Sequence, residues 1–262
     1  MLKNKNYHDF LITLKKLKKT NTIGVKQSLE DEGATFDEIS FMRMITKKLG
    51  IMHYVKIGGC EAINDILFCK KIKIDGIIAP MIESSYALQK FIQSIKFSGY
   101  KNKVYLNIET ISAIKNLDKI LKTDEARHLS GITIGRSDIC GSLNLEKKHT
   151  DNKKIFKLTK NAANKIKKYN FNLKIGGSIN AKSKNFLQKL YNKKLIKYFE
   201  TRNIEIKINN KNLEMFNDII KNIFSAEISW LQLKKDINNQ NNLLKRDYKK
   251  RTFELKKRLD LK

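Results

Sequence analysis

The sequence predicts an α/β protein, a (β/α)8 TIM barrel followed by a C-terminal helical extension. Short apolar segments alternate with longer amphipathic segments from residue 22 to about residue 208. The short segments are almost continuously apolar, which is typical of strands in a parallel sheet that helices cover. Strict alternation over this length favours a barrel. An open, doubly wound sheet is the alternative, but no GxGxxG motif follows the first strand.

The N-terminal half contains clear helix and strand signals. Tyr7, Phe10 and Leu14 recur at helical spacing, which predicts a helix over 7–19. The strands that follow are runs of apolar residues, and each later helix carries an apolar stripe, with Gly50 ending the second one. Strands are expected at 22–28, 52–57, 75–81 and 103–109, and helices at 34–50, 60–72, 85–97 and 112–121.

The C-terminal half continues the alternation of strands and helices. Strands are expected at 131–135 and 172–177, helices at 154–169 and 182–194, and a further strand within 196–208. These segments complete seven clear strands. The eighth has two possible places, the end of the last segment or the region near the N-terminus.

The chain is expected to divide into a barrel domain, 1–224, and a basic helical extension, 225–262. Trp230, Leu231 and Leu233 suggest an apolar face on the extension. A partner helix or a second subunit would bury this face, whereas a solvated, fraying helix would leave it open. The asparagine-rich stretch 238–242 is expected to interrupt the helix.

The overall charge bears on the class of partner. The formal net charge is +28, and only seven of the 54 basic residues are arginine. A polyanion partner is one explanation. The other is a coding bias, since lysine, asparagine and isoleucine are all abundant. Nucleic-acid readers use arginine for bidentate base contacts, so nucleic acid is not the partner that we expect.

The sequence predicts a soluble, cytoplasmic protein without a membrane partner. No apolar run approaches the roughly 20 residues that span a bilayer, and the N-terminus lacks a signal-peptide pattern. The three cysteines, Cys60, Cys69 and Cys140, contain no CxxC pair, which argues against disulfides and structural zinc.

Carboxylates follow two neighbouring strands of the expected barrel. Glu109 ends the strand 103–109, and Asp138 comes soon after the strand 131–135. TIM barrels place working residues at the C-terminal ends of strands, so we expect these carboxylates to lie close together. An oxygen-only pair suits Mg²⁺ or Mn²⁺. The alternative is that both acids cap helices or pair with lysines.

Three segments together resemble a known family. They are DGIIAPMIESSYALQKF (75–91), NIETISAIKNLDKIL (107–121) and GITIGRSDICGSLNL (131–145). In this order they resemble the HpcH/HpaI aldolase and citrate lyase beta-subunit family, within the phosphoenolpyruvate-binding barrel superfamily. The resemblance covers roughly residues 22–206. It implies a TIM barrel, a homo-oligomer, and an oxo-acid or acyl-coenzyme A substrate.

The resemblance also implies roles for single residues. The family's metal-binding glutamate and aspartate fall on Glu109 and Asp138, which implies Mg²⁺ or Mn²⁺ as cofactor. Lys56 stands at the place of an arginine that binds the oxo acid and stabilises its enolate. Lysine keeps the charge but loses the bidentate fork. Gly33 stands where many family members carry a proton-transferring histidine.

A carboxylate is therefore expected to transfer the proton in place of the histidine. Glu30, Glu32 and Glu61 are the candidates, because each follows an early strand. Glu32 and Glu61 join Lys56 in the predicted catalytic set. Arg202, at the end of a late strand, is a predicted substrate-binding residue.

The tetrapeptide KIGG occurs twice, at 56–59 and at 174–177. Each copy ends an expected strand, where glycine lets a ligand approach the backbone. The second copy suits a phosphate or a coenzyme A tail, although a simple glycine turn is equally compatible. The predicted substrate-binding glycines are Gly58, Gly59, Gly135, Gly176 and Gly177.

These features predict a divalent-metal-dependent carbon–carbon lyase that works through an enolate. A barrel that has lost its chemistry and serves binding or assembly is the main alternative, since the histidine is missing. A polyanion binder is the third.

Overall fold

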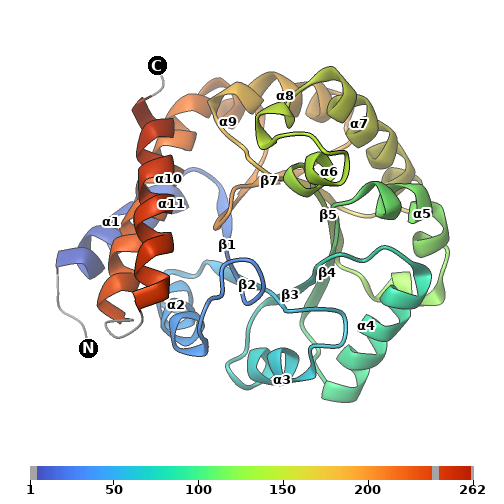
Figure 1. The fold of residues 1–262 in the computed structure, drawn as a ribbon, viewed down its shortest axis with the longest axis horizontal. Helices are drawn as coiled ribbons and strands as arrows, with labels where there is room; N and C mark the ends of the chain where they lie inside the picture. Colours follow the sequence, from blue (N-terminus) through green and yellow to red (C-terminus); the bar gives the residue numbers. More distant parts are fainter. Residues whose placement is uncertain (1–4, 238–241, 261–262) are drawn as a thin grey trace. The chain divides into compact units, whose positions relative to one another are not determined.

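Eight strands close into a barrel in chain order, in a computed structural model that describes residues 5–237 and 242–260. Neighbouring strands from β1 to β7 run parallel. Figure 1 shows the strands arranged in a ring. The predicted barrel is confirmed. The strands are β1 (Thr22–Ser28), β2 (Met52–Lys56), β3 (Gly76–Ala79), β4 (Lys103–Ile108), β5 (Gly131–Gly135), β6 (Leu173–Gly176), β7 (Tyr198–Glu200) and β8 (Ile204–Lys207).

The last strand differs from the prediction of a wholly parallel sheet. β8 pairs antiparallel with β7, and Glu200 lies opposite Glu205. Only residues 201–203 connect the two strands. A parallel strand needs a long crossover, so this short turn can only return the chain antiparallel. The segment 196–208 therefore holds two strands, and the eighth lies at its end, which is one of the two places expected for it.

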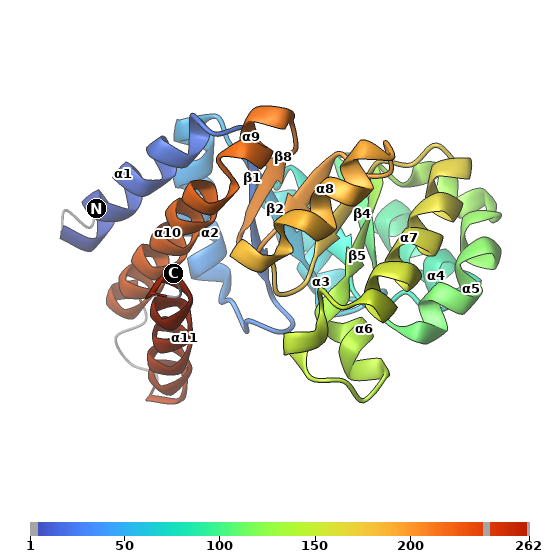
Figure 2. The same ribbon diagram turned by 90° about the horizontal axis from the view of Figure 1, so that it is seen from above.

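Helices surround the strands, as Figures 1 and 2 show. Thr35 caps α2 by accepting the Glu38 backbone N–H at 3.2 Å, and Gly50 ends it in the left-handed conformation with φ 62°. The short helix α6 was not predicted, because seven residues cannot show an apolar stripe. The helices are α2 (Phe36–Leu49), α3 (Ile63–Lys71), α4 (Ser85–Ser98), α5 (Ile111–Leu121), α6 (Arg136–Ser142), α7 (Lys153–Lys168) and α8 (Lys184–Asn192).

Side chains alternate between the two faces of each strand. Val55, Ile77, Leu106 and Ile132 are fully buried on the outer faces, where the helices pack. The residues between them point into the barrel, and many of these are polar or charged. The apolar core of the barrel unit thus lies between strands and helices, and the interior is free for polar groups.

Two tyrosines fill the N-terminal half of the interior. Tyr54 and Tyr105 meet edge to face with ring centroids 5.5 Å apart. A Cβ atom at Gly24 would lie 2.2 Å from the Tyr54 ring, and one at Gly76 would lie 2.6 Å from it. The neighbouring strands therefore need glycine at these two positions.

Residues up to Thr22 and from Asn209 onward form a second compact unit. Trp230 packs against Phe10 with ring centroids 5.3 Å apart, and Leu233 is fully buried. Among the alternatives expected for this apolar face, burial by a helix is the one observed, and the helix belongs to the same chain. The helices are α1 (Lys5–Lys18), α9 (Asn210–Glu214), α10 (Phe216–Ile237) and α11 (Asn242–Asp260).

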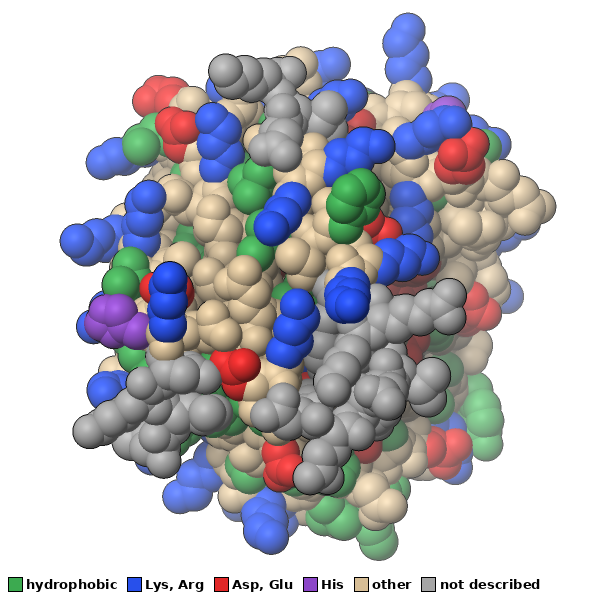
Figure 3. All heavy atoms as spheres, turned by 60° about the vertical axis from the view of Figure 1, so that its left-hand side comes forward, with side chains coloured by type: hydrophobic (Ala, Val, Ile, Leu, Met, Phe, Trp, Pro, Cys, Tyr) green, Lys and Arg blue, Asp and Glu red, His purple; other side chains and the backbone are tan. Residues whose placement is uncertain are grey.

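The predicted boundary between residues 224 and 225 falls inside α10, which continues through it. The predicted interruption lies at residues 238–241, outside the described residues, and at Asn242, where α11 begins. Over the described residues, the helices are too short or too polar to cross a membrane. Lysine and arginine side chains are scattered across the face drawn in Figure 3 among uncharged ones.

Candidate functional site

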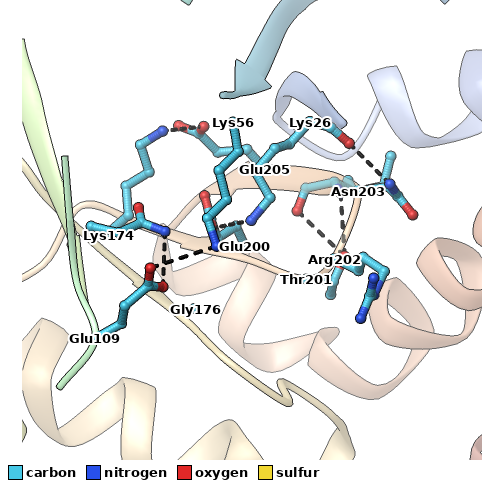
Figure 4. A network of polar contacts seen from close by, with 12 residues as sticks. Lys26, Lys56, Glu109, Lys174, Gly176, Glu200, Thr201, Arg202, Asn203 and Glu205 are labelled. Carbon is cyan, nitrogen blue, oxygen red and sulfur yellow. Dashed lines mark hydrogen bonds and ion pairs between the residues drawn. The ribbon is translucent and has the colours of Figure 1, made fainter. Parts of the chain in front are cut away.

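Charged side chains from most strands of the barrel point into its interior. Figure 4 shows three lysines and three glutamates converging there. Each of the three glutamates is only 2% exposed. A buried charge is costly unless it is paired, so the pairing decides which of these groups remains free for chemistry. The six residues are Lys26, Lys56, Glu109, Lys174, Glu200 and Glu205.

Lys56 ends β2 at the C-terminal mouth of the barrel. Its Nζ lies 2.7 Å from Glu30 Oε2 and 3.5 Å from Glu109 Oε1. Burial opposes the charge of Lys56, but Glu109 and Glu30 outweigh burial and raise its pKa above the usual range. The ammonium group of Lys56 therefore stays protonated, which suits binding of a carboxylate or enolate oxygen and does not suit the role of a base.

Glu109 is a buried carboxylate with donors on both oxygens. Oε1 accepts the Met81 backbone N–H at 3.1 Å, and Oε2 accepts Asn107 Nδ2 at 3.1 Å. Met81 donates from a left-handed backbone with φ 50°. Burial raises the pKa of Glu109; Lys56 opposes this shift and the negative charge of Asp138 adds to it.

Glu109 and Asp138 are the two carboxylates that would hold a divalent cation. Asp138 is exposed in the first turn of α6, directly after β5, and repels Glu109. A cation between the two relieves that repulsion. A Cβ atom at Gly135 would lie 2.9 Å from Glu109 Oε2, so this glycine makes room for the carboxylate.

The described residues contain no group of three His, Cys, Asp or Glu side chains that suits a metal. Water and substrate would complete the coordination shell, as Mg²⁺ allows.

Glu200, at the end of β7, carries a charge despite its burial. Lys26 Nζ pairs with Glu200 Oε1. Burial favours the neutral acid, but Lys26, Lys174 and Lys56 outweigh it and lower the pKa of Glu200. The pKa of Lys26 is raised in turn, because Glu200 outweighs its burial. Neither Lys26 nor Glu200 is among the predicted site residues.

Lys174 and Glu205 form a second pair deeper in the barrel. Lys174 Nζ lies 2.6 Å from Glu205 Oε2, and 4.5 Å and 4.2 Å from the ring centroids of Tyr54 and Tyr105. Burial raises the pKa of Glu205, with Lys174 opposing. The aromatic rings and the ion pair together close the interior below the mouth.

The second KIGG copy is held by Arg136, a fully buried residue at the start of α6. Arg136 Nε donates to the Gly176 carbonyl at 3.1 Å, and Nη2 donates to the Gly177 carbonyl at 2.8 Å. Asp151 and the ring of Phe186 engage the same guanidinium. Gly177 has φ 83°, and a Cβ there would lie 2.4 Å from a backbone nitrogen of α6. These contacts give the backbone at both glycines a structural role. The substrate-binding role of the two glycines stays a prediction.

Glu32 and Arg202 lie together at another part of the rim. Arg202 Nη1 is 3.7 Å from Glu32 Oε1 and 3.5 Å from Asp31 Oδ2. Asn203 Nδ2 donates to both Glu32 oxygens, at 3.0 and 3.2 Å. These contacts join the loop after β1 to the β7–β8 turn. The structure brings neither Glu32 nor Arg202 into contact with Lys56 among the interactions of the described residues.

Glu61 and the first KIGG glycines lie toward the surface. The Glu61 side chain is 56% exposed, and its Oε1 pairs with Lys90 Nζ at 2.8 Å. Gly58 donates its N–H to Asp65 Oδ2 at 2.8 Å. A Cβ atom at Gly59 would meet nothing within 4 Å. The Gly58 N–H group is thus engaged by Asp65, and the substrate-binding role of Gly58 and Gly59 stays a prediction.

Glu30, among the three predicted carboxylates, is the one whose ion pair reaches Lys56. Its side chain is 29% exposed, so it stands at the rim within reach of solvent. The alternation of inward and outward residues along each strand predicts part of this arrangement from the sequence. Lys26, Lys56 and Lys174 occupy the strand face opposite to the apolar residues, which places all three inside the barrel.

Comparison with known proteins shows which solved structures share this fold. No protein-family model and no curated protein matches the sequence. An HpcH/HpaI aldolase from Desulfitobacterium hafniense DCB-2 matches with TM-score 0.59 at 11% identity, over 89% of this chain and 90% of that chain. This chain has the fold of the HpcH/HpaI aldolases.

Two further structures agree with that result. The citrate synthase SbnG matches with TM-score 0.58 at 12% identity, over 88% of this chain and 91% of that one. An HpcH/HpaI aldolase/citrate lyase family protein from Burkholderia cenocepacia J2315 matches with TM-score 0.59 at 8% identity, over 75% and 83%. The resemblance in the sequence is confirmed at the level of the fold. At these sequence identities the structural similarity shows the fold and does not show the activity.

Proposed function

We propose that this chain is a carbon–carbon lyase of the HpcH/HpaI aldolase and citrate lyase type. Its substrate would be a 2-oxo acid or an acyl-coenzyme A thioester that reacts through an enolate. The observation that carries the proposal is the contact between Lys56 and Glu109 at the mouth of a barrel with this fold. A buried cation beside a buried carboxylate suits a substrate whose negative charge moves during the reaction.

Lys56 would bind the substrate carboxylate and the oxygen on which enolate charge develops. Its raised pKa keeps the ammonium charged throughout. Glu30, paired with Lys56 at the partly exposed rim, would accept the proton of the substrate hydroxyl. The O–H electrons then form a carbonyl, the carbon–carbon bond breaks, and its electron pair becomes the enolate. The enolate carbon takes up a proton to complete the cleavage.

Glu109 and Asp138 would hold Mg²⁺ or Mn²⁺. Such an ion, when bound, polarises the substrate carbonyl and offsets enolate charge. The chain's own part is to fix Glu109 through Met81 and Asn107, and to leave room for its carboxylate at Gly135.

The test is a retro-aldol assay on a panel of 4-hydroxy-2-oxo acids and 3-hydroxyacyl-coenzyme A thioesters, with Mg²⁺, Mn²⁺ or EDTA. Glu109→Gln and Asp138→Asn should each lower kcat about 100-fold or more, the scale at which lost electrostatic stabilisation acts. Asp118→Asn, which changes a surface carboxylate paired with Lys165, is the matched control. Unchanged thermal unfolding should accompany every variant.

Full activity in both Glu109→Gln and Asp138→Asn would refute the proposed site. Ligand binding without turnover by the unsubstituted chain would instead favour a barrel that binds and does not catalyse. Gly33, in place of the family's histidine, is the feature that motivates this second candidate.

A further inference from the structure

Three buried oxygen atoms face the barrel interior without a hydrogen-bond partner among the described residues. They are Asn107 Oδ1, Thr133 Oγ1 and Glu200 Oε2. The three residues are 4%, 1% and 2% exposed. An unsatisfied buried polar atom is costly, and native proteins keep few of them. Three in one interior call for a common explanation.

The three residues are neighbours around the barrel. Asn107 of β4 lies opposite Thr133 of β5 in the strand register. On β6 the register partner of Thr133 is Lys174. Gly176 is two residues further along β6, and a Cβ atom there would lie 3.5 Å from Thr133 Cγ2 and 3.2 Å from Glu200 Cγ. Gly176 thus separates Thr133 from Glu200 without a side chain of its own. The three oxygens line one side of the interior.

The remaining polar atoms of these side chains are already engaged. Asn107 Nδ2 donates to Glu109 Oε2 at 3.1 Å, and Glu200 Oε1 pairs with Lys26. These contacts fix both side chains and leave Asn107 Oδ1 and Glu200 Oε2 as spare acceptors. Glu200 is ionised, because its lysine neighbours lower its pKa. It is thus a strong acceptor and a weak base, which suits binding rather than proton abstraction.

We propose that Asn107, Thr133 and Glu200 form a subsite for a hydrogen-bond-donor group of the ligand. The donor is a hydroxyl or an ammonium group, carried by a molecule whose carboxylate pairs with Lys56. This inference rests on the proposed function for the role of Lys56, and it adds a required chemical feature of the substrate.

Lys56 stands at the entrance to this subsite. Figure 4 shows its ammonium beside Glu109 and Glu200. Its closest carboxylate is Glu30, at the partly exposed rim. A ligand carboxylate competes with Glu109 for the ammonium, and the flexible lysine stem allows it to move aside. A ligand without a carboxylate lacks the means to displace it.

Water is the simplest other occupant of such a site, since buried waters commonly satisfy orphaned polar groups. Water and a ligand donor group predict different selectivity. A subsite that only holds water does not distinguish a ligand that ends in a methyl group from one that ends in a hydroxyl or ammonium group.

The experiment is isothermal titration calorimetry on the full chain with unreactive straight-chain carboxylates. Chains of three, four and five carbons are each used with a terminal methyl, hydroxyl or ammonium group. For at least one length, a donor-ended probe should bind about 10-fold or more tightly than its methyl-ended counterpart, as a hydrogen bond to a buried acceptor allows. The hydroxyl and ammonium arms show which donor the subsite takes.

Thr133→Val is the decisive variant because it removes the hydroxyl and keeps the shape. The preference for the donor-ended probe should fall to about 3-fold or less, as expected for one lost hydrogen bond. Thr159→Val is the matched control, since Thr159 is another buried threonine with an unpartnered hydroxyl, but on α7. It should leave the preference unchanged.

Equal affinity for the methyl-ended and donor-ended probes, absence of any binding, or an unaltered preference in Thr133→Val overturns the subsite. The comparison of probes on the unsubstituted chain stands without any variant. Because calorimetry needs no turnover, a preference without lyase activity would reject the proposed function alone. Turnover without a preference would reject the subsite alone.

Discussion

His53 is fully buried on the outer face of β2, and neither ring nitrogen has a hydrogen-bond partner in the described part of the chain. Burial, helped by the charge of Arg43, lowers the pKa of His53 to about 3. The nearby carboxylate of Asp75 is already engaged by Arg43 and by the His53 backbone N–H at 2.8 Å. The imidazole is therefore neutral in the folded protein.

This depressed pKa makes stability depend on pH. In the unfolded chain the imidazole titrates near 6.5. Below that pH the unfolded state binds a proton that the folded state does not, so the free energy of unfolding falls as pH drops from 6.5 toward 3. Each pH unit is worth about 1.4 kcal/mol, so His53 should remove about 2 kcal/mol between pH 7.5 and pH 5.

Urea denaturation at pH 7.5 and pH 5.0, followed by circular dichroism, measures this loss. His53→Phe keeps a ring of similar size and removes the titration, so it should lack the additional loss of about 2 kcal/mol. Carboxylates that titrate in the same range act equally in both proteins and cancel in the difference. A loss that is the same in both proteins, within about 0.5 kcal/mol, would show that His53 is not the buried neutral group described here.

Two further predictions concern the barrel interior and the loop after β3. Lys174→Met should lower the free energy of unfolding by about 3–5 kcal/mol, because it leaves the buried Glu205 carboxyl group without its ion-pair partner. The double variant with Glu205→Leu should recover most of that loss in urea denaturation, and a double variant as unstable as the single one would contradict the pairing. Met81→Gly should raise stability by about 1 kcal/mol, since the left-handed backbone at φ 50° strains a side-chain-bearing residue. A lowered melting temperature for this glycine variant would argue against strain at Met81.

Much of the fold can be predicted from local patterns. Apolar runs such as the one in β3 and the caps of α2 are encoded within a few residues, so strands and helices up to β7 lie close to the predicted positions. The seven-residue helix α6 could not be predicted in this way, because it is too short to show a period. The place of β8 was one of two alternatives, but its antiparallel direction depends on the three-residue turn after β7.

The site was predictable in part for the same reason. Lys56 is the last residue of β2 and Glu109 directly follows β4, and the barrel brings Lys56 Nζ to 3.5 Å from Glu109 Oε1. Glu32 and Glu61 could not be told apart from Glu30, because all three follow early strands. Their ion pairs with Arg202, Lys90 and Lys56 depend on loop geometry that no local pattern contains.

Strand periodicity and chain order, which are local properties, are enough to place Lys56 and Glu109 at one end of a barrel. The identity of each ionic partner is not a local property. Lys26 pairs with Glu200, 174 positions away, and Lys174 pairs with Glu205, because a closed barrel brings distant strands face to face. In a dry interior a charge must find an opposite charge, so closure of the sheet settles which carboxylate oxygens are used and which remain for a ligand.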